Sequence, residues 1–586
     1  MAHLNTIRTL ARGVRRFRAI IPLVLLLSTG RSLRAQTPSL SDRLPASTVF
    51  FAYWHGMGAV TSAEKTNHIV QLFEDPQFVH ARDTLFKGLR ESIAKNGPAT
   101  SDREQAEVLS LFDNPAVVGV VLNPKLEKKP TADSGAPPVT VFFVVYDAHG
   151  KTAIVEKLRA ANRATGKEVP TVMSYDFQGT KIEARATGTD VSYTALTSKY
   201  YFLADQKSVI EELIARFGGA EKPADSVTQL PEYASMRSFI GADSALEFFA
   251  RFPNLTKILT PAQLEKPATK FAVNLHLDRI SVFGGSVSFA GEAMRFHGAM
   301  IGEADAGGVF DFAGTSGTSF VTAPAVNSGP IFSISRFNFV AIYQMLRAAA
   351  EPLLTSQQTA AMGMYEKMAQ GFLGMPAPDA LQLFTGEIAS ETSFADDGSS
   401  QRTYAISIQK PQDVLRILRA AGASFTVGED TSGTATYLDL VFPSTDPKTG
   451  AKKREFYYVA VTPTMLFAAP RKALIRQAIG HLDAKTDAAL AGAGILSGAE
   501  LAHQRSLLPE KLSGLSAADI VQIPWDKVIA HVADEMAKAA KESNTPPPST
   551  DWLQAVKPEV LTRHIHTGIS GWWKDSHGIY FDSYIQ

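Results

Sequence analysis

The sequence of 586 residues contains no cysteine. Disulfides, thiolate metal sites, a cysteine nucleophile and lipid attachment at a cysteine are therefore all excluded. Net charge is also absent, because 58 Lys and Arg residues balance 58 Asp and Glu residues. Without a net field the chain is a poor candidate for binding nucleic acid or an acidic substrate. Beyond the N-terminal segment no run of 18 apolar residues occurs, so we expect no membrane span in the mature chain.

The first 35 residues have the order of a targeting segment. Five arginines in residues 8–18 precede the apolar run "AIIPLVLLLSTG", and the small residue Ala35 follows. This order is typical of a secretory signal peptide, and the run is shorter than the roughly 20 residues that span a bilayer as a helix. We therefore expect a signal peptide over residues 1–35 and export to the periplasm or cell envelope. An uncleaved membrane anchor is the alternative.

Two stretches of the chain repeat one pattern at a distance of 265 residues, "YYFLADQKSVIEELIARF" at 200–217 and "MLFAAPRKALIRQAIGHL" at 465–482. Each indicates a buried strand that leads into an amphipathic helix. The apolar helix positions correspond as Val209 to Leu474, Ile210 to Ile475, Leu213 to Ala478, Ile214 to Ile479 and Phe217 to Leu482.

Further matches occur in the same order at offsets of 260 to 284 residues. They are "LSLF" with "LQLF" (109 and 381), "IVEKLRAA" with "VLRILRAA" (154 and 414), "LPE" with "LPE" (230 and 508), "AD" with "AD" (242 and 518) and "RISVFGGS" with "RHIHTGIS" (279 and 563). We interpret the pattern as a tandem duplication, with a first repeat over 44–303, a Gly/Ser/Thr-rich flexible joint over 304–323 and a second repeat over 324–586.

The predicted fold class is α+β, with each half forming a mostly antiparallel sheet packed with helices. Alternation of apolar and polar residues along "ARATGTDVSYTAL" and "FGGSVSFAGEAMRFHGAM" favours antiparallel hairpins with one solvated face. A chain of this length also exceeds what one hydrophobic core usually serves, which agrees with two units.

The motifs of serine enzymes and nucleotide-binding proteins are incomplete. Ser62 and Lys65 form an S-x-x-K element and "KTG" stands at 448–450, but no S-x-N element separates them, and Ser92 with Lys95 repeats the pattern by chance. No G-x-S-x-G pentapeptide occurs, and "HGKT" at 149–152 has Val145 where a phosphate-binding loop needs glycine. The sequence therefore predicts no catalytic and no cofactor-binding residues.

The best metal candidate is "RHIHTG", where His564 and His566 would share one face of a strand. A third ligand is missing, because His577 stands 11 residues beyond His566 in a turn. We therefore predict no metal site. Trp572 and Trp573 are expected on opposite faces of a strand, one in the core and one exposed at a contact surface.

Two acidic positions have plain interpretations. Asp396 and Asp397 are expected in a hairpin turn, where they serve the backbone. Asp439 lies in the apolar strand "TYLDLVF", on the face of Tyr437, and we expect it to point to solvent.

The opening "LPASTVFFAYW" at 44–54 resembles the mature N-terminus of a family of uncharacterised bacterial exported proteins, which begin with an LP-x-x-T strand. The resemblance implies an envelope location and no assigned chemistry. Our first hypothesis is a non-enzymatic binding or assembly protein whose partner is a protein, a glycan or an apolar ligand. The alternatives are a hydrolase with a dispersed active site between the halves and a carrier of an apolar ligand.

Overall fold

The structure is a computed structural model. It describes residues 39–61, 66–80, 110–122, 140–164, 171–187, 190–219, 223–241, 244–252, 265–289, 291–303, 308–326, 328–423, 425–445, 452–483, 495–542 and 557–586.

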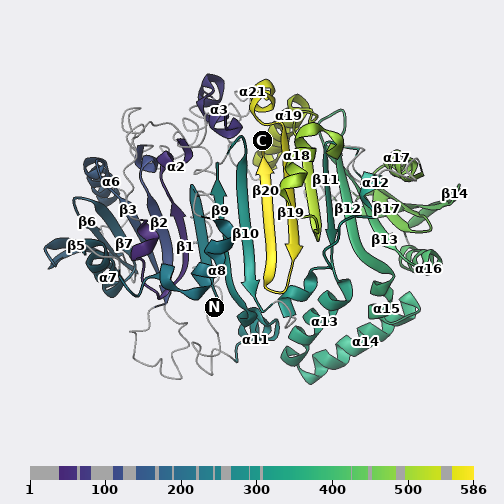
Figure 1. The fold of residues 1–586 in the computed structure, drawn as a ribbon. Helices are drawn as coiled ribbons and strands as arrows, with labels where there is room; N and C mark the ends of the chain where they lie inside the picture. Colours follow the sequence, from purple (N-terminus) through teal and green to yellow (C-terminus); the bar gives the residue numbers. More distant parts are fainter. Residues whose placement is uncertain are drawn as a thin grey trace.

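One antiparallel sheet of 20 strands forms the body of the molecule (Figure 1). The first ten strands are β1 (Thr48–Trp54), β2 (Ala116–Leu122), β3 (Thr140–Asp147), β4 (Thr171–Phe177), β5 (Thr180–Thr187), β6 (Asp190–Leu196), β7 (Tyr200–Ala204), β8 (Leu246–Arg251), β9 (Ile280–Ser288) and β10 (Met294–Gly302). The last ten are β11 (Ile331–Arg336), β12 (Phe384–Phe394), β13 (Ser400–Ile408), β14 (Thr426–Ser432), β15 (Ala435–Thr445), β16 (Lys452–Val461), β17 (Met465–Ala469), β18 (Gly514–Asp519), β19 (Thr567–Lys574) and β20 (Gly578–Ile585).

The strand order is symmetrical about the ladder between β10 and β20. From its outer edge inwards the first set pairs as β4-β5-β6-β7-β3-β2-β1-β8-β9-β10. The second set pairs as β14-β15-β16-β17-β13-β12-β11-β18-β19-β20. At the middle His297 of β10 pairs with Asp582 of β20. We expected one sheet in each half; the backbone edges of β10 and β20 pair instead, which makes the sheet continuous.

One face of the sheet, named here the helix face, is packed against helices. In the first set these are α7 (Lys207–Gly218) and α8 (Pro231–Ile240), and in the second α17 (Lys472–Asp483) and α18 (Ala499–Leu507). α8 begins with proline at its first turn and ends at Gly241, whose φ of 76° suits glycine as a helix stop. Figure 1 shows α8 and α18 in front of the strands.

Two hydrophobic cores lie beneath these helices. Phe51, Phe143 and Phe249 are fully buried against α7 and α8 in the first, and Phe332 and Phe467 are buried with the α17 and α18 side chains in the second. Burying a side chain of this size stabilises the fold by roughly 1.5–3 kcal/mol. The cores therefore fix the helix face of every central strand.

The opposite face, named here the open face, is covered near the two ends of the sheet. α6 (Thr152–Ala164) contributes Val155 to a small core with Tyr146, and α16 (Pro411–Gly422) packs Val414 and Leu415 against β16 and β17.

The remaining helices lie around the strands. They are α2 (Met57–Thr61), α3 (His68–Glu74), α11 (Pro267–Asn274), α12 (Ala323–Val326), α13 (Phe339–Ala350), α14 (Ser356–Leu373), α15 (Ala377–Gln382), α19 (Trp525–Glu542) and α21 (Pro558–His564). The short 3-10 helices are η1 (Leu40–Arg43), η2 (Ser110–Asp113), η3 (Val227–Gln229), η4 (Leu277–Arg279), η6 (Gly308–Phe312), η7 (Glu351–Leu353) and η9 (Ile495–Ser497). Within the described ranges no helix is both long and apolar enough to cross a bilayer.

Some of the sequence matches occupy matching elements. Val209 and Leu474 stand in the helices that follow β7 and β17, and Ile154 and Val414 in those that follow β3 and β13. The described part of "LSLF" lies in η2, four residues before β2, whereas "LQLF" runs from the end of α15 to the first residue of β12.

Other matches fail. The first "LPE" begins α8 whereas the second follows α18, and the second "AD" ends β18 while residues 242–243 lie outside the described ranges. Gly284 and Gly568 stand in β9 and β19 but on opposite faces of the sheet, because Gly284 is buried whereas Gly568 lies between the buried residues Thr567 and Ile569. Short matches of two or three residues do not fix a register.

The Gly/Ser/Thr-rich joint is held to the second half rather than left free. Gly314 donates its N–H to the carbonyl of Arg336, and Gly317 exchanges two backbone hydrogen bonds with Leu512. The Ser316 and Ser513 hydroxyls are 2.8 Å apart.

Candidate functional site: the open face of the sheet

Burial alternates along the central strands and leaves the open face partly accessible. In β20 Tyr580, Asp582 and Tyr584 are buried on the helix face, while Phe581 and Ser583 between them keep partial exposure. β1, β2, β8, β11 and β19 alternate in the same way. Alternation of this kind marks a sheet with one packed face and one face available for contacts.

Four phenylalanines form a continuous line of rings across the open face, named here the aromatic row: Phe283, Phe248, Phe296 and Phe581. Their ring centroids are 5.6, 6.1 and 5.5 Å apart in that order. Phe283 is 46% exposed. The row crosses the middle of the sheet, because Phe296 belongs to β10 and Phe581 to β20.

Glycines in neighbouring strands make room for Phe248 of this row and for Trp572 on the same face. A Cβ atom on Gly285 would lie 2.8 Å from two ring atoms of Phe248, and one on Gly514 would lie 1.8 Å from Nε1 of Trp572. The aromatic side chains therefore lie flat over the backbone of the next strand, and larger residues at these glycines would displace them.

Five serines form a second line on the same face, named here the serine row. Ser390, Ser333, Ser516, Ser570 and Ser583 are cross-strand partners in sequence on β12, β11, β18, β19 and β20. Ser516 donates to Ser333 and Ser570 donates to Ser583, each at 2.8 Å. Since Ser583 pairs with Phe296, the serine row meets the aromatic row at the β10–β20 ladder.

The centre of the open face is uncharged in the described residues. Neither row contains an acidic or basic side chain. Lys574, at the end of β19, directs its amine to the carbonyl of Phe310 at 2.9 Å. Such a surface, with accessible aromatic rings and hydroxyls, has the composition of a binding surface rather than of a solvated one.

The helix face beneath α8 carries a second polar group, which is buried. Four residues on four adjacent strands are cross-strand partners, and all are buried: Glu247, Ser286, His297 and Asp582. Arg237 of α8 donates to Glu247 at 2.7 Å, and Ser286 donates to the carbonyl of Ile240. These bonds attach α8 to the sheet.

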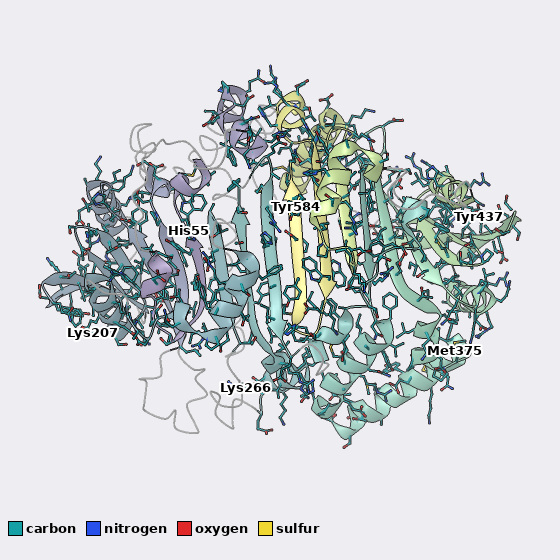
Figure 2. The ribbon with its side chains drawn as sticks, viewed as in Figure 1. His55, Lys207, Lys266, Met375, Tyr437 and Tyr584 are labelled. Atoms are coloured by element: carbon teal, nitrogen blue, oxygen red, sulfur yellow. The ribbon has the colours of Figure 1, made fainter. Side chains whose placement is uncertain are left out.

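Two members of this buried polar group, His297 and Asp582, lie on the adjacent strands β10 and β20 and so join the two halves. Arg295 donates to both carboxylate oxygens of Asp582, at 3.2 and 2.8 Å, and Tyr584 donates to one of them at 3.1 Å. Nδ1 of His297 lies 3.5 Å from Asp582. Burial lowers the pKa of His297 more than the nearby carboxylate raises it, so this histidine is neutral near pH 7. Figure 2 labels Tyr584 at the middle of the sheet and His55 in the first half.

Catalysis by a serine, a base and an orienting acid needs the acid and the serine on different nitrogens of the histidine. The Ser244 hydroxyl and the Glu247 carboxylate both approach Nε2 of His55, at 3.4 and 3.8 Å. The Ser576 hydroxyl and Asp575 likewise both approach Nδ1 of His577. Neither arrangement can relay a proton from serine through histidine to the acid.

The prediction that His564 and His566 share a strand face is wrong. Pro558 begins α21, His564 ends it, and β19 begins only at Thr567. His564 instead contacts Asp75 at 3.1 Å, and His566 contacts Glu500 at 3.2 Å. Among the described residues no group of three His, Asp or Glu residues could hold a metal ion.

Asp75 directly follows α3 and links it to α21. It contacts His564, and it accepts a hydrogen bond from Arg563 at 3.0 Å. Burial acts to raise the pKa of Asp75, but hydrogen bonds from His564 and from backbone N–H groups outweigh it and the pKa lies below its usual value. The role is structural, because Asp75 links the first half to the second.

The two tryptophans lie on opposite faces, as predicted, but both are partly buried. Trp573 stacks on Tyr580 and contacts Phe239 of α8 on the helix face. Trp572 lies on the open face, where its ring nitrogen donates to Ser335 at 3.3 Å.

The predicted turn role of Asp397 is confirmed, because it accepts from the N–H and hydroxyl of Ser399 at the β12–β13 hairpin. Asp439 does not point freely to solvent. The amine of Lys472 in α17 lies 3.2 Å from Asp439 and 2.6 Å from Asp430, so it bridges the two carboxylates.

The signal segment, both S-x-x-K elements and "KTG" lie outside the described residues.

Sequence reasoning missed both rows of the open face. Each strand contributes one or two of these side chains, so only the ladder register brings them together.

Comparison with protein-family models, with curated proteins and with solved structures gave no match.

Proposed function

We propose that this chain is an exported envelope protein that arose by tandem duplication and acts by binding a ligand on the open face of its sheet, without catalysis. The accessible, uncharged aromatic row is the observation that carries the binding proposal. Soluble proteins seldom leave connected aromatic rings accessible unless a partner covers them.

The duplication is supported by the strand order. Two sets of ten strands with one pairing order would require many coincidences if each half had originated separately. The corresponding positions of α7 with α17 and of α6 with α16 add to this support. The N-terminal order of arginines, apolar run and Ala35 supports export.

Binding is favoured over hydrolysis by the geometry of the serine and histidine contacts. The two buried carboxylates of the helix face are held by Arg237 and Arg295, and the open face has hydroxyls but no general base within either row. An acyl-transfer site needs a base within hydrogen-bond reach of its nucleophile.

An uncharged fluorescent dye, N-phenyl-1-naphthylamine, tests this function on the purified mature protein. We expect saturable binding that Phe283→Ser weakens by about tenfold or more, because a buried phenylalanine contributes roughly 1.5–3 kcal/mol. The matched control is Phe442→Ser on β15, where the phenylalanine is 38% exposed but far from the aromatic row.

Equal weakening by both substitutions, or by neither, would contradict the proposal. So would labelling of one serine by a fluorophosphonate probe that is lost when the protein is heat-denatured, since this would reveal an activated nucleophile.

A further inference from the structure

The two halves carry opposite chemistry at the same place on the open face. Across β3, β2, β1, β8, β9 and β10 the cross-strand partners are Val144, Val118, Ala52, Phe248, Gly285 and Gly298. Across β13, β12, β11, β18, β19 and β20 they are Tyr404 and then the five residues of the serine row. An apolar row in the first half thus corresponds to a hydroxyl row in the second.

The serine row retains unused hydrogen-bonding capacity. Ser333 and Ser583 accept from their neighbours, and within the described residues nothing accepts their own hydroxyl protons. Adjacent strands lie about 4.8 Å apart, so five hydroxyls extend over about 19 Å. A ligand with several hydroxyl groups can both donate to and accept from such a row.

The aromatic row begins where the serine row ends. Phe581 and Ser583 are neighbours on one face of β20, and Phe296 lies directly opposite Ser583. An apolar chain on the rings would therefore continue into a polar group on the serines. Because both rows are uncharged, a charged head group would lose its hydration without gaining an ionic partner.

Resting on the proposed binding function, we propose that the ligand is an uncharged amphiphile, with an alkyl chain on the aromatic row and a polyhydroxyl head on the serine row. The chemistry is that of a glycolipid. The ligand spans the β10–β20 ladder, so both halves contribute to one site.

Dodecyl maltoside is the probe, measured by titration calorimetry below its critical micelle concentration. Dodecyldimethylamine oxide, with the same chain and no hydroxyl group, and free maltose are the reference compounds. We expect the maltoside to bind more tightly than either. The double variant Ser516→Ala with Ser570→Ala should weaken the maltoside about tenfold, as the loss of two hydrogen bonds predicts, and leave the amine oxide unchanged.

The matched control replaces Ser238 and Ser506, which are exposed on α8 and α18 and donate only to carbonyls of their own helices. Thermal unfolding of each variant shows that the fold is kept. If the maltoside and the amine oxide bind equally and the serine variant changes neither, the assignment of the head group is wrong. If Phe283→Ser also leaves every affinity unchanged, the binding function itself fails.

Discussion

At the scale of single residues, His297 and Asp582 are two buried polar side chains that differ in their hydrogen bonding. They are cross-strand neighbours on the two innermost strands, one from each half, and both are buried. Asp582 is satisfied by Arg295 and Tyr584, whereas Nδ1 of His297 has no hydrogen bond within the described residues. The histidine is therefore the member of the pair with an unsatisfied polar atom.

Acid should weaken the fold through His297. Burial depresses its pKa in the folded state, so the unfolded chain, with a pKa near 6.5, binds the proton first. Stability from this group is complete above about pH 6.5 and falls as the pH decreases toward the folded pKa. The groups that face it are Arg295 on its own strand, Asp582 on β20 and the Phe239 ring of α8.

Urea unfolding between pH 5 and 8 measures this effect, with His297→Gln as the comparison. The wild-type protein should lose more free energy of unfolding below pH 6.5 than the variant does. Parallel pH profiles would show that His297 does not titrate in this range.

At the scale of elements, a glycine in a strand and a glycine in a helix differ in how much space surrounds them. Gly285 of β9 lies under Phe248, and a Cβ atom there would stand 2.3 Å from the carbonyl oxygen of His297. Gly363 of α14 has no atom within 4 Å of the same position. A larger residue would therefore clash with its neighbours at Gly285, whereas Gly363 has room for a side chain.

Alanine at these two sites should have opposite effects. Gly285→Ala should destabilise the protein by about 2 kcal/mol or more, because backbone and ring must both move. Gly363→Ala should stabilise it by up to about 1 kcal/mol, the difference in helix propensity. Denaturant unfolding measures the free energy of unfolding of both variants. An unchanged value for Gly285→Ala would mean that β9 and β10 can move apart without cost.

The sequence predicted those elements whose pattern is local. β7 with α7 and β17 with α17 form the strand and helix that the repeated pattern predicts, and the apolar stripes of both helices face the cores as expected. β19 was placed too early, since Pro558 starts a helix that the alternation in "RHIHTG" conceals. The serine row could not be predicted, because its residues are scattered between Ser333 and Ser583 and only the ladder aligns them.

At the scale of the molecule, two cores share one sheet. The cores beneath α7 and α8 and beneath α17 and α18 are distinct, and the β10–β20 ladder with its buried carboxylate joins them. We therefore expect this ladder to carry much of the coupling between the halves, beside the contacts of Asp75 with Arg563 and His564.

The wild-type protein should unfold in one transition, in which tryptophan fluorescence and far-ultraviolet circular dichroism coincide. Asp582→Ala removes the partner of Arg295 and Tyr584, costs about 2 kcal/mol, and should separate the two curves. Asp575→Ala, in the β19–β20 turn, is the control. Coincident curves for Asp582→Ala would show that the buried carboxylate is not needed to couple the halves.

The β10–β20 ladder also sets an order of assembly. β20 is synthesised after the other nineteen strands, and its ladder joins Met294 to Ile585 across most of the chain. Loop-closure entropy makes pairing at such a separation slow, so the ladder forms late. Until then β10 keeps an unpaired edge, a template for wrong partners. We therefore expect a nascent chain to need protection of that edge while its second half emerges, which is the task of a holding chaperone.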